Sequence, residues 1–325
     1  MIPSDIHASA DVLPAVKAVK DEVRKAVVGY EDQIDDFMIC LLSQGHLLIE
    51  GVPGIAKTTL SRAFSQVCGL SHRRIQFTQD LLPADITGHY FFNQRTGEFE
   101  VRKGPLFAGF VLADEINRAP PKTQSALLEA MQERQVTIEG TRFDLPDPFI
   151  VVATLNPIET EGVYPLPEAQ IDRFMVKSTM DYLSEEQEID VLRLKGGSEK
   201  NLEMVLSKDA ILDMRKNVER VHTHPSILSY IESITRATRA LDDLDLGLSP
   251  RGAIHLLQTA KAHAYIHGRN YVIPDDVKAM AHKVIDHRLI LSPEGELSGL
   301  TRAGVTDSIL ATVPVPKGDY SGAEI

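Results

Sequence analysis

The chain has 325 residues, of which 43% are hydrophobic, and its formal net charge is −12. This length suggests about two domains with a substantial core, and the acidic charge argues against a protein whose main task is to grip a nucleic-acid backbone. The two cysteines, Cys40 and Cys68, show no metal-binding spacing and are interpreted as core thiols in a reducing compartment, the cytoplasm. No run approaches the roughly 18 apolar residues that a membrane span requires.

Three near-continuous apolar runs of strand length lie in the first 180 residues, and each ends in polar residues. They cover residues 46–50, 109–114 and 149–156. Such runs are typical of parallel strands that are buried on both faces, and the carboxyl ends of parallel strands share one edge of the sheet. The segments after these strands should therefore converge. These segments are Gly51–Thr59, Asp114-Glu115 and Asn156.

The remaining elements suggest a change of architecture near residue 184. Residues 89–101 and 135–145 predict β-hairpins that project from the globular body. After residue 184, apolar residues recur at helical spacing. Helix start signals stand at Ser207, Pro225, Ser249-Pro250 and Pro274. The sequence therefore predicts an α/β domain over residues 1–183 and a smaller helical domain over residues 184–325.

The segment 51–58, GVPGIAKT, follows the first strand and leads into a helix predicted over residues 57–64. It matches the phosphate-binding pattern G-x-x-x-x-G-K-[ST], except that Ala56 replaces the last glycine. Backbone N–H groups surround a phosphate at such a turn, and Lys57 in the first helical turn is mildly unfavourable without an anion. Alanine is tolerated at position 56 if its φ is negative. The alternative is a turn that merely joins strand to helix.

Asp114 and Glu115 are adjacent carboxylates at the end of the second apolar run. They are costly to desolvate unless a cation or water engages them, and with the loop nearby magnesium is the predicted partner. Thr58 and Asp114 would hold the ion, and Glu115 would orient or deprotonate the attacking water. Asn156 could bind the γ-phosphate or that water, although Asn-Pro is also a turn signal.

The helical part contains two further features. Arg251 follows Ser249-Pro250 at the start of a helix, where a cation is disfavoured unless an anion is near; a surface arginine is the alternative. His263 and His267 have the spacing of a zinc pair, but Ala264 stands where a metalloprotease has glutamate. The two histidines are therefore interpreted as ordinary helix residues.

Five longer stretches together resemble a MoxR-type AAA+ ATPase, and the resemblance spans nearly the whole chain. They are GVPGIAKT (51–58), QFTQDLLPADITG (76–88), GPLFAGFVLADEINRAPPKTQSALLEAMQERQVTIEG (104–140), ATLNPIETEGVYPLPEAQIDRF (153–174) and GRNYVIPDDVK (268–278). Members of this family commonly have alanine in place of the last loop glycine. The resemblance implies an α/β fold: an AAA+ P-loop core, with a parallel sheet flanked by helices and the two hairpins as insertions, followed by a smaller all-helical lid domain.

The resemblance also assigns roles, residue by residue. The implied nucleotide-binding residues are Val28, Gly29, Gly51, Val52, Pro53, Gly54, Ile55, Ala56, Lys57, Thr58, Thr59, Asp114 and Arg251. The implied catalytic residues are Lys57, Glu115, Asn156 (sensor 1), Arg173 (arginine finger) and Arg251 (sensor 2), and the implied magnesium ligands are Thr58 and Asp114. Without the family, a local ion pair with Asp172 explains Arg173 equally well. Arg118 faces either a neighbouring subunit or solvent.

ATP or ADP and Mg²⁺ are the implied cofactors, and ATP hydrolysis is the implied reaction, in a homo-oligomeric ring that is a hexamer with ATP. The leading hypothesis is a chaperone-like motor that remodels or matures client complexes, for example by metal insertion, together with a partner that has a von Willebrand factor A domain. A motor subunit of a metal chelatase is the alternative. A nucleic-acid motor is disfavoured, because it would need a basic strip facing the ring pore.

Overall fold

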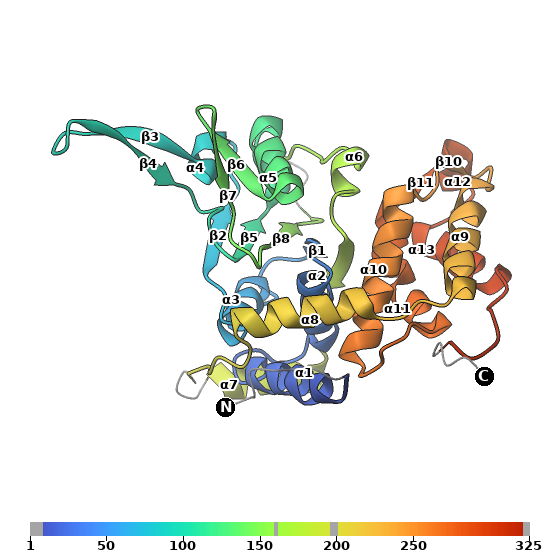
Figure 1. The fold of residues 1–325 in the computed structure, drawn as a ribbon. Helices are drawn as coiled ribbons and strands as arrows, with labels where there is room; N and C mark the ends of the chain where they lie inside the picture. The colour runs from blue at the N-terminus through green and yellow to red at the C-terminus, as the bar shows by residue number, and fades with distance from the viewer. Residues whose placement is uncertain (1–8, 159–161, 196–200, 321–325) are drawn as a thin grey trace.

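The computed structural model describes residues 9–158, 162–195 and 201–320, and within them a five-stranded parallel sheet forms the centre (Figure 1). The strand order is β2-β5-β8-β1-β9. The strands are β1 (Leu47–Gly51), β2 (His72–Gln76), β5 (Phe110–Asp114), β8 (Ile150–Leu155) and β9 (Val176–Met180). The three predicted runs are β1, β5 and β8, whereas β2 and β9 are not predicted. These two lie at the sheet edges, and in β2 only Ile75 is buried, so no apolar run marks them.

Helices cover both faces of the sheet. Alternate side chains of each strand enter different apolar clusters: Leu47 and Ile49 of β1 pack on one side, and Leu48 packs on the other. The first side is covered by α1, α2 and α3, and the second by α5. The bounds are α1 (Ser9–Val23), α2 (Glu31–Leu42), α3 (Lys57–Val67), α4 (Pro83–Thr87), η1 (Ile116–Arg118), α5 (Pro121–Glu133) and α6 (Glu168–Ile171).

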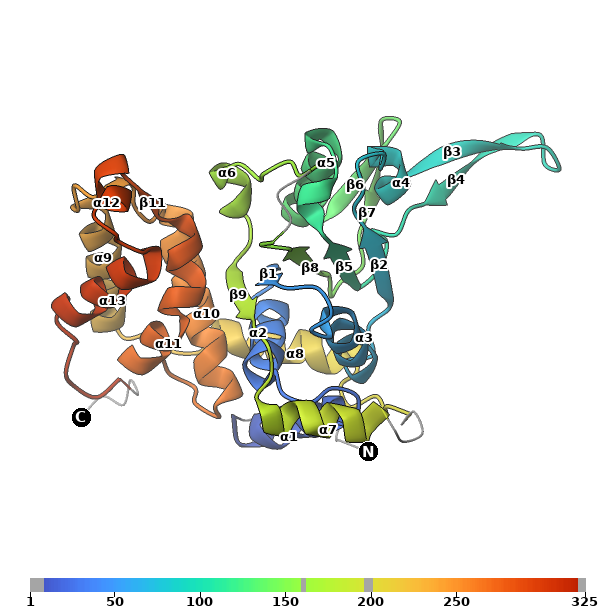
Figure 2. The ribbon, with the colours of Figure 1, turned by 180° about the vertical axis from the view of Figure 1, so that it is seen from behind.

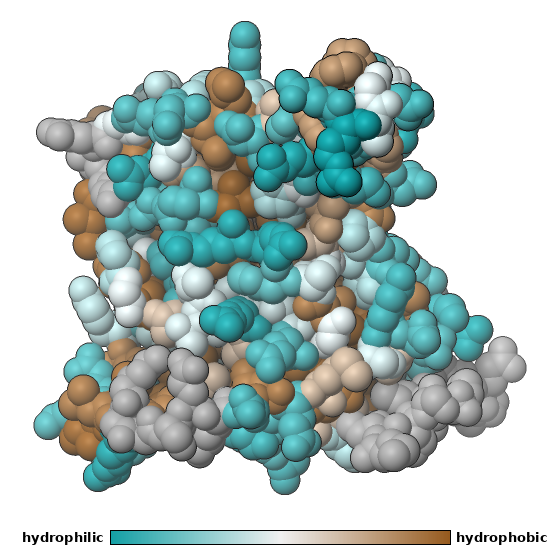
Figure 3. Space-filling model, turned by 90° about the vertical axis from the view of Figure 1, so that its left-hand side faces the viewer, coloured by the Kyte–Doolittle hydropathy of each residue, from teal (hydrophilic) through white to brown (hydrophobic). Residues whose placement is uncertain are grey.

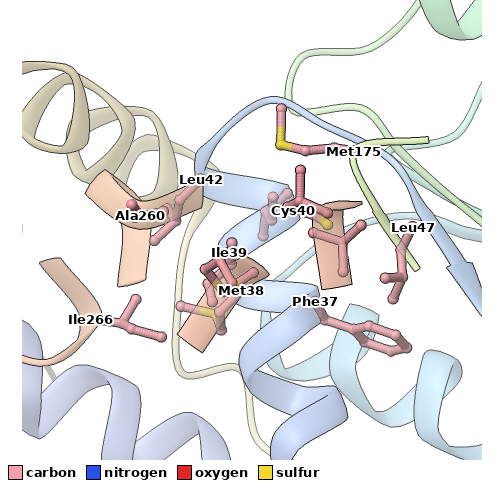
Figure 4. Packing of buried hydrophobic residues seen from close by; sticks show 14 of the residues in the cluster. Phe37, Met38, Ile39, Cys40, Leu42, Leu47, Met175, Ala260 and Ile266 are labelled. Atoms are coloured by element: carbon pink, nitrogen blue, oxygen red, sulfur yellow. The ribbon is translucent and has the colours of Figure 1, made fainter. Parts of the chain in front are cut away.

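The larger apolar cluster is centred on α2, which Figure 4 shows between the sheet and α10. Phe37 and Cys40 of α2 are fully buried, as are Leu47 of β1 and Ala260 of α10. Cys40 and Cys68 are both free thiols, and burial raises the pKa of each. The interpretation of both cysteines as core thiols is therefore confirmed.

Two antiparallel hairpins project beside α4 and α5 (Figure 1). They are β3 (Gly88–Asn93) with β4 (Glu98–Lys103), and β6 (Gln135–Ile138) with β7 (Thr141–Asp144). Figure 3 views the molecule from the side of the β3–β4 tip, where hydrophilic and hydrophobic residues are mixed. On this hairpin Phe92 and Phe99 contact each other edge to face, yet 52% and 71% of their surfaces remain exposed.

The C-terminal part is a mainly helical lobe beside the sheet (Figures 1 and 2). Its elements are α9 (Pro225–Arg239), β10 (Leu244–Leu246), α10 (Pro250–Ile266), α11 (Pro274–Ile285), η2 (Asp286–Arg288), β11 (Ile290–Leu291), α12 (Pro293–Leu297) and α13 (Arg302–Thr312). α9, α10 and α11 begin at the predicted signals, and the Ser249 hydroxyl caps α10 by accepting from the Gly252 N–H at 3.1 Å. The small β10–β11 sheet is not predicted.

Two helices connect the sheet domain to this lobe. α7 (Glu185–Lys195) lies beside α1 in both ribbon views, and α8 (Lys208–Arg220) packs against α2 and α10. α8 begins after Ser207, as predicted, and the Ser207 hydroxyl caps it. The domain boundary at residues 183/184 stays a prediction. None of the helices in the described part of the chain combines the length and the apolar character needed to cross a bilayer.

A buried arginine joins the lobe to the segment that precedes β9. Arg288 is 6% exposed and donates to Asp172 Oδ1 at 2.7 Å and to the Phe174 carbonyl at 2.6 Å. Asp172 also accepts from Arg251 at 3.3 Å and from the Ser249 hydroxyl at 3.4 Å. Burial lowers the pKa of Arg288, and the Asp172 carboxylate opposes that shift. One carboxylate thus gathers three donors from the C-terminal lobe.

We expect Arg288→Met to lower the free energy of unfolding by about 3 kcal/mol or more, because Asp172 and several carbonyl groups lose a buried donor. Urea unfolding followed by circular dichroism measures this change. Arg236→Met is the matched control, since Arg236 lies on the same lobe, is 78% exposed and pairs with Glu232 on its own helix. The control should change stability by less than about 0.5 kcal/mol. Equal losses for the two variants would contradict this account.

Candidate active site

The segment between β1 and α3 forms a tight loop at the carboxyl edge of the sheet. A Cβ at Gly51 would lie 2.6 Å from the Met180 carbonyl oxygen on β9, so only glycine fits there. Lys57 opens α3 with 9% of its surface exposed, and its Nζ donates to the Gly51 carbonyl at 2.7 Å. Burial lowers the pKa of Lys57, and the carboxylates of Asp114 and Glu115 oppose that shift. The loop therefore holds a buried cation near both carboxylates.

Ala56 does not meet the expected condition of a negative φ. Its φ is +65° and its ψ is 18°, which is the left-handed region. This conformation costs a residue with a Cβ roughly 1–2 kcal/mol. The Ala56 carbonyl accepts the first helical hydrogen bond of α3, from the Leu60 N–H at 2.9 Å. The sharp turn from loop to helix thus imposes the conformation, and alanine occupies it under strain.

Asp114 ends β5 and is 8% exposed, and each of its carboxylate oxygens has a protein donor. Arg74 of β2 donates to Oδ2 from Nε at 3.0 Å and from Nη2 at 2.7 Å. The Thr154 hydroxyl of β8 donates to Oδ1 at 2.7 Å. β2 and β8 flank β5, which brings both donors to Asp114. Oδ1 keeps a lone pair for the water shell of a metal ion, so Asp114 fits its predicted role.

Glu115 follows in a left-handed conformation, with φ +56°. Its N–H donates to the Thr154 hydroxyl at 2.8 Å, and its Oε2 accepts from Gln76 at 2.7 Å and from Arg118 at 3.1 Å. Such backbone strain gathers at functional sites, where the surrounding contacts must hold it in place. These contacts therefore hold the Glu115 carboxylate in place with a set of donors different from the set that holds the Asp114 carboxylate. Arg118 contacts Glu115 of its own chain.

Asn156 follows β8 and is 4% exposed. Its Oδ1 accepts from the Ile158 N–H at 3.2 Å, but its Nδ2 is buried and has no hydrogen-bond partner among the described residues. An unpaired buried donor costs about 1–3 kcal/mol, and a phosphate oxygen or a water molecule is a suitable acceptor. A buried cation, two carboxylates and an unsatisfied donor thus stand at one sheet edge. This set of groups fits a nucleotide phosphate chain with a divalent cation.

A mainly apolar cavity of about 420 Å³ lies beside the loop. The predicted binding residues that line it are Val28, Pro53, Gly54, Ile55, Ala56 and Thr59. Tyr30 and Leu183 also contribute, and α7 forms one wall. Gly29 is not part of the lining, but a Cβ there would meet the Leu183 side chain at 2.7 Å, so glycine lets this wall close. A concave, largely apolar site next to a phosphate loop suits a nucleobase.

Arg173 and Arg251 do not line this cavity. They line a second one, of about 370 Å³, together with His46 and Met175, which directly precede β1 and β9. This cavity therefore lies at the amino edge of the sheet, about 16 Å, or one strand length, from the loop edge. Arg173 donates to the Leu128 carbonyl at 3.1 Å. Among the described residues, Asp172 forms its ion pairs with Arg251 and Arg288, not with Arg173.

Arg74, Gln76 and Thr154 are site residues that the sequence does not single out. The parallel register pairs Gln76 with Asp114, but this follows only once β2 is known to be a strand beside β5. The interpretation of His263 as an ordinary helix residue agrees with its partner: His263 Nδ1 lies 2.6 Å from Asp276 Oδ1, and Arg269 also pairs with this buried carboxylate. No group of three or more potential metal ligands gathers in the described residues.

Comparisons with known proteins agree with this geometry. Residues 46–176 match the ATPase family associated with various cellular activities (AAA), and residues 236–308 match the AAA lid domain. The uncharacterised protein YeaC of Bacillus subtilis is 44% identical over 94% of this chain and 96% of its own. Chaperone MoxR1 of Mycobacterium tuberculosis is 41% identical over 91% of this chain and 81% of its own. A crystal structure from Cytophaga hutchinsonii, named as a candidate ATPase, has a TM-score of 0.89 and 43% identity, covering 95% of this chain and 97% of its own.

We expect Ala56→Gly to raise the free energy of unfolding by roughly 1 kcal/mol, because glycine removes the left-handed strain. Urea unfolding without nucleotide measures the change. Ala63→Gly, in the interior of α3, is the matched control and should destabilise the protein, since glycine there adds only unfolded-state entropy and a small void. Destabilisation by both substitutions would show that the strain at Ala56 is not released.

Proposed function

The chain belongs to the MoxR family of AAA+ ATPases, and we propose that it uses magnesium-dependent ATP hydrolysis at the loop of residues 51–58 to drive a chaperone-like motor. The observation that carries this proposal is the unsatisfied donor of Asn156 at the sheet edge that also holds Lys57 and the two carboxylates, next to the loop that lines an apolar cavity.

The phosphate and metal contacts follow from the loop. Lys57 and the loop N–H groups bind the phosphates, while Thr58 and Asp114 hold the magnesium ion. When bound, magnesium neutralises charge on the transferring phosphoryl group. Arg74 donates twice to Asp114 Oδ2 and so orients the carboxylate that would hold the ion.

Two residues, at the ends of neighbouring strands, act on the attacking water. Glu115 accepts hydrogen bonds from Gln76 and Arg118, which orient the carboxylate so that it can hold the water and accept its proton. Asn156 Nδ2 donates to the γ-phosphate or to that water. The nucleobase occupies the apolar cavity beside Val28 and Gly29.

Arg173 and Arg251 act on the nucleotide of an adjacent copy in a homo-oligomeric ring, a hexamer with ATP. Their cavity lies at the opposite sheet edge from the loop, so a head-to-tail contact between copies brings the loop of one to the arginines of the next. Repeated head-to-tail contacts close into a ring. An arginine supplied by a neighbour is worth about 10³-fold or more in known phosphoryl-transfer enzymes.

The work done with ATP is the remodelling or maturation of client protein complexes, for example by metal insertion, in the cytoplasm and with a partner that has a von Willebrand factor A domain. The chaperone name of the relative MoxR1 supports this class. Exposed Phe92 and Phe99 on the projecting β3–β4 hairpin offer an apolar contact for a client. The acidic charge of −12 continues to disfavour a nucleic-acid substrate.

Lys57→Ala should weaken ATP binding, whereas Glu115→Gln should keep ATP binding and lose most turnover, on the order of 10²-fold or more, because it keeps the charge at Asp114 that holds magnesium. Binding of a fluorescent ATP analogue and release of phosphate separate the two defects. Glu139→Gln, on the exposed β6–β7 turn, is the charge-matched control and should behave like the unmodified protein. Unchanged turnover in Glu115→Gln would remove Glu115 from the proposed role.

The same Glu115→Gln protein tests the chaperone assignment. Because this variant stays in its ATP state, it should retain its client in a pull-down with the purified A-domain partner. The ATPase activity of the unmodified protein should rise when that partner is added, and not when DNA is added. Stimulation by DNA alone would favour the nucleic-acid motor.

Arg173→Ala and Lys57→Ala proteins should each be inactive but should recover part of the ATPase activity when mixed. The Lys57→Ala subunit cannot use ATP but still offers Arg173 to a neighbour with an intact loop. Phosphate release from verified mixed rings measures the recovery, and hydrolysis by the unmodified protein should rise with protein concentration. Normal turnover by Arg173→Ala alone, or mixed rings without activity, would contradict action between subunits.

A further inference from the structure

The cavity at the amino edge is positively charged in a chain of net charge −12. Three arginines, Arg134, Arg173 and Arg251, line it, and its described lining includes no Asp or Glu. The two lining histidines are neutral at pH 7, because burial lowers the pKa of His46 to about 4 and that of His255 to about 3. The positive charge of the cavity therefore comes from arginine alone.

Arg134 is the member of this set that neither the sequence analysis nor the family motifs assign. It ends α5 in the left-handed conformation, with φ +53°. The backbone there is held at both ends, since its N–H donates to the Ala130 carbonyl and its carbonyl accepts from the Leu145 N–H, each at 3.0 Å. Its Nη2 donates to the Gln44 carbonyl at 2.6 Å. A strained, well-held backbone thus aims this guanidinium at the cavity.

Among the described residues, no ion pair compensates the charge of Arg134. Asp147 is the carboxylate that acts on its pKa, but Asp147 pairs with Arg215, at 2.6 Å. Burial therefore lowers the pKa of Arg134, with Asp147 opposing it only at longer range. Arg173 also lacks a carboxylate partner among the described residues, since its hydrogen bond there is to the Leu128 carbonyl. Two half-buried guanidinium groups without a carboxylate partner create a site for an external anion.

We propose that this cavity receives the phosphate groups of a nucleotide held by a second copy of the chain, and that Arg134 is a third arginine that binds them beside Arg173 and Arg251. The proposal rests on the head-to-tail arrangement given above. Planar guanidinium forks match phosphate oxygens in pairs. The occupant comes from another copy because the chain's own loop lies at the far edge of the same sheet.

The test begins with Arg134→Gln, which removes the charge and keeps most of the side chain, and with Arg134→Lys, which keeps the charge and loses the fork. Arg142→Gln, on the exposed strand β7, is the matched control. Arg134→Gln should lower turnover roughly tenfold to a hundredfold, the range for a lost charge-assisted hydrogen bond. Arg134→Lys should recover part of this loss, and Arg142→Gln should change little. Urea unfolding midpoints establish that each variant is folded.

Mixed rings decide on which subunit Arg134 acts. Arg134→Gln mixed with Lys57→Ala should regain activity, because the Lys57→Ala subunit presents three intact arginines to a neighbour with an intact loop. Arg134→Gln mixed with Arg173→Ala should turn over no faster than Arg134→Gln alone, because every cavity in such a ring lacks one arginine. If the first mixture stays inactive while Arg173→Ala is rescued by Lys57→Ala, Arg134 serves its own subunit and the inference fails. If Arg173→Ala is not rescued either, the head-to-tail arrangement itself is wrong.

A binding measurement without turnover separates the neighbour's nucleotide from a free anion. Dilute, unassembled Arg134→Gln should bind fluorescent ADP like the unmodified protein, while its assembly with a slowly hydrolysed ATP analogue, followed by sedimentation, should need at least about tenfold more protein. Inorganic tripolyphosphate is the second probe, added to unassembled Lys57→Ala. Tripolyphosphate binding that Arg134→Gln abolishes in this background, together with unchanged assembly of Arg134→Gln on the ATP analogue, would identify a free anion as the occupant and overturn the proposal.

Discussion

The parallel direction of the central strands is the constraint on which the proposed chemistry depends. It puts every carboxyl end at one edge, so Gly51, Asp114 and Asn156 meet although about 100 residues of sequence separate the first from the last. The same constraint places Arg173 at the opposite edge, because it precedes β9 instead of following it. Lys57 and Arg173 therefore lie at two different edges of the sheet, and the proposed contact between copies would bring them to one phosphate chain.

The sequence predicts the parts of the fold that leave a one-dimensional signal. β1, β5 and β8 are buried on both faces and read as apolar runs, and the helices after Ser207 and Ser249 carry their caps in the sequence. β2 leaves no such signal, because four of its five residues are not buried at this sheet edge. The sequence therefore does not identify Arg74 and Gln76 as partners of the carboxylates, since their role depends on the pairing of β2 with β5.

Backbone strain is the second property that the sequence did not reveal. Ala56, Glu115 and Arg134 all have positive φ without being glycine, and each lies beside a proposed contact to a nucleotide. In each case a hydrogen bond of the neighbouring structure fixes the turn: Leu60 to Ala56, Glu115 to Thr154, and Leu145 to Arg134. A glycine would satisfy the geometry but would lose two of the side chains that the site uses. At these positions the backbone conformation favours glycine, whereas the proposed function requires a side chain. The large apolar core stabilises the fold and so offsets the cost of this strain.

The C-terminal half links the two edges. α7 forms a wall of the apolar cavity beside the loop, and α10 supplies Arg251 to the arginine cavity. α8, which lies between these two helices in chain order, packs on both α2 and α10. Asp172 then ties the start of α10 and Arg288 to the residue next to Arg173. Packed helices move as units and do not deform continuously, so the packing of α8 on α2 and α10 holds α10, and with it Arg251, in a fixed position relative to the sheet.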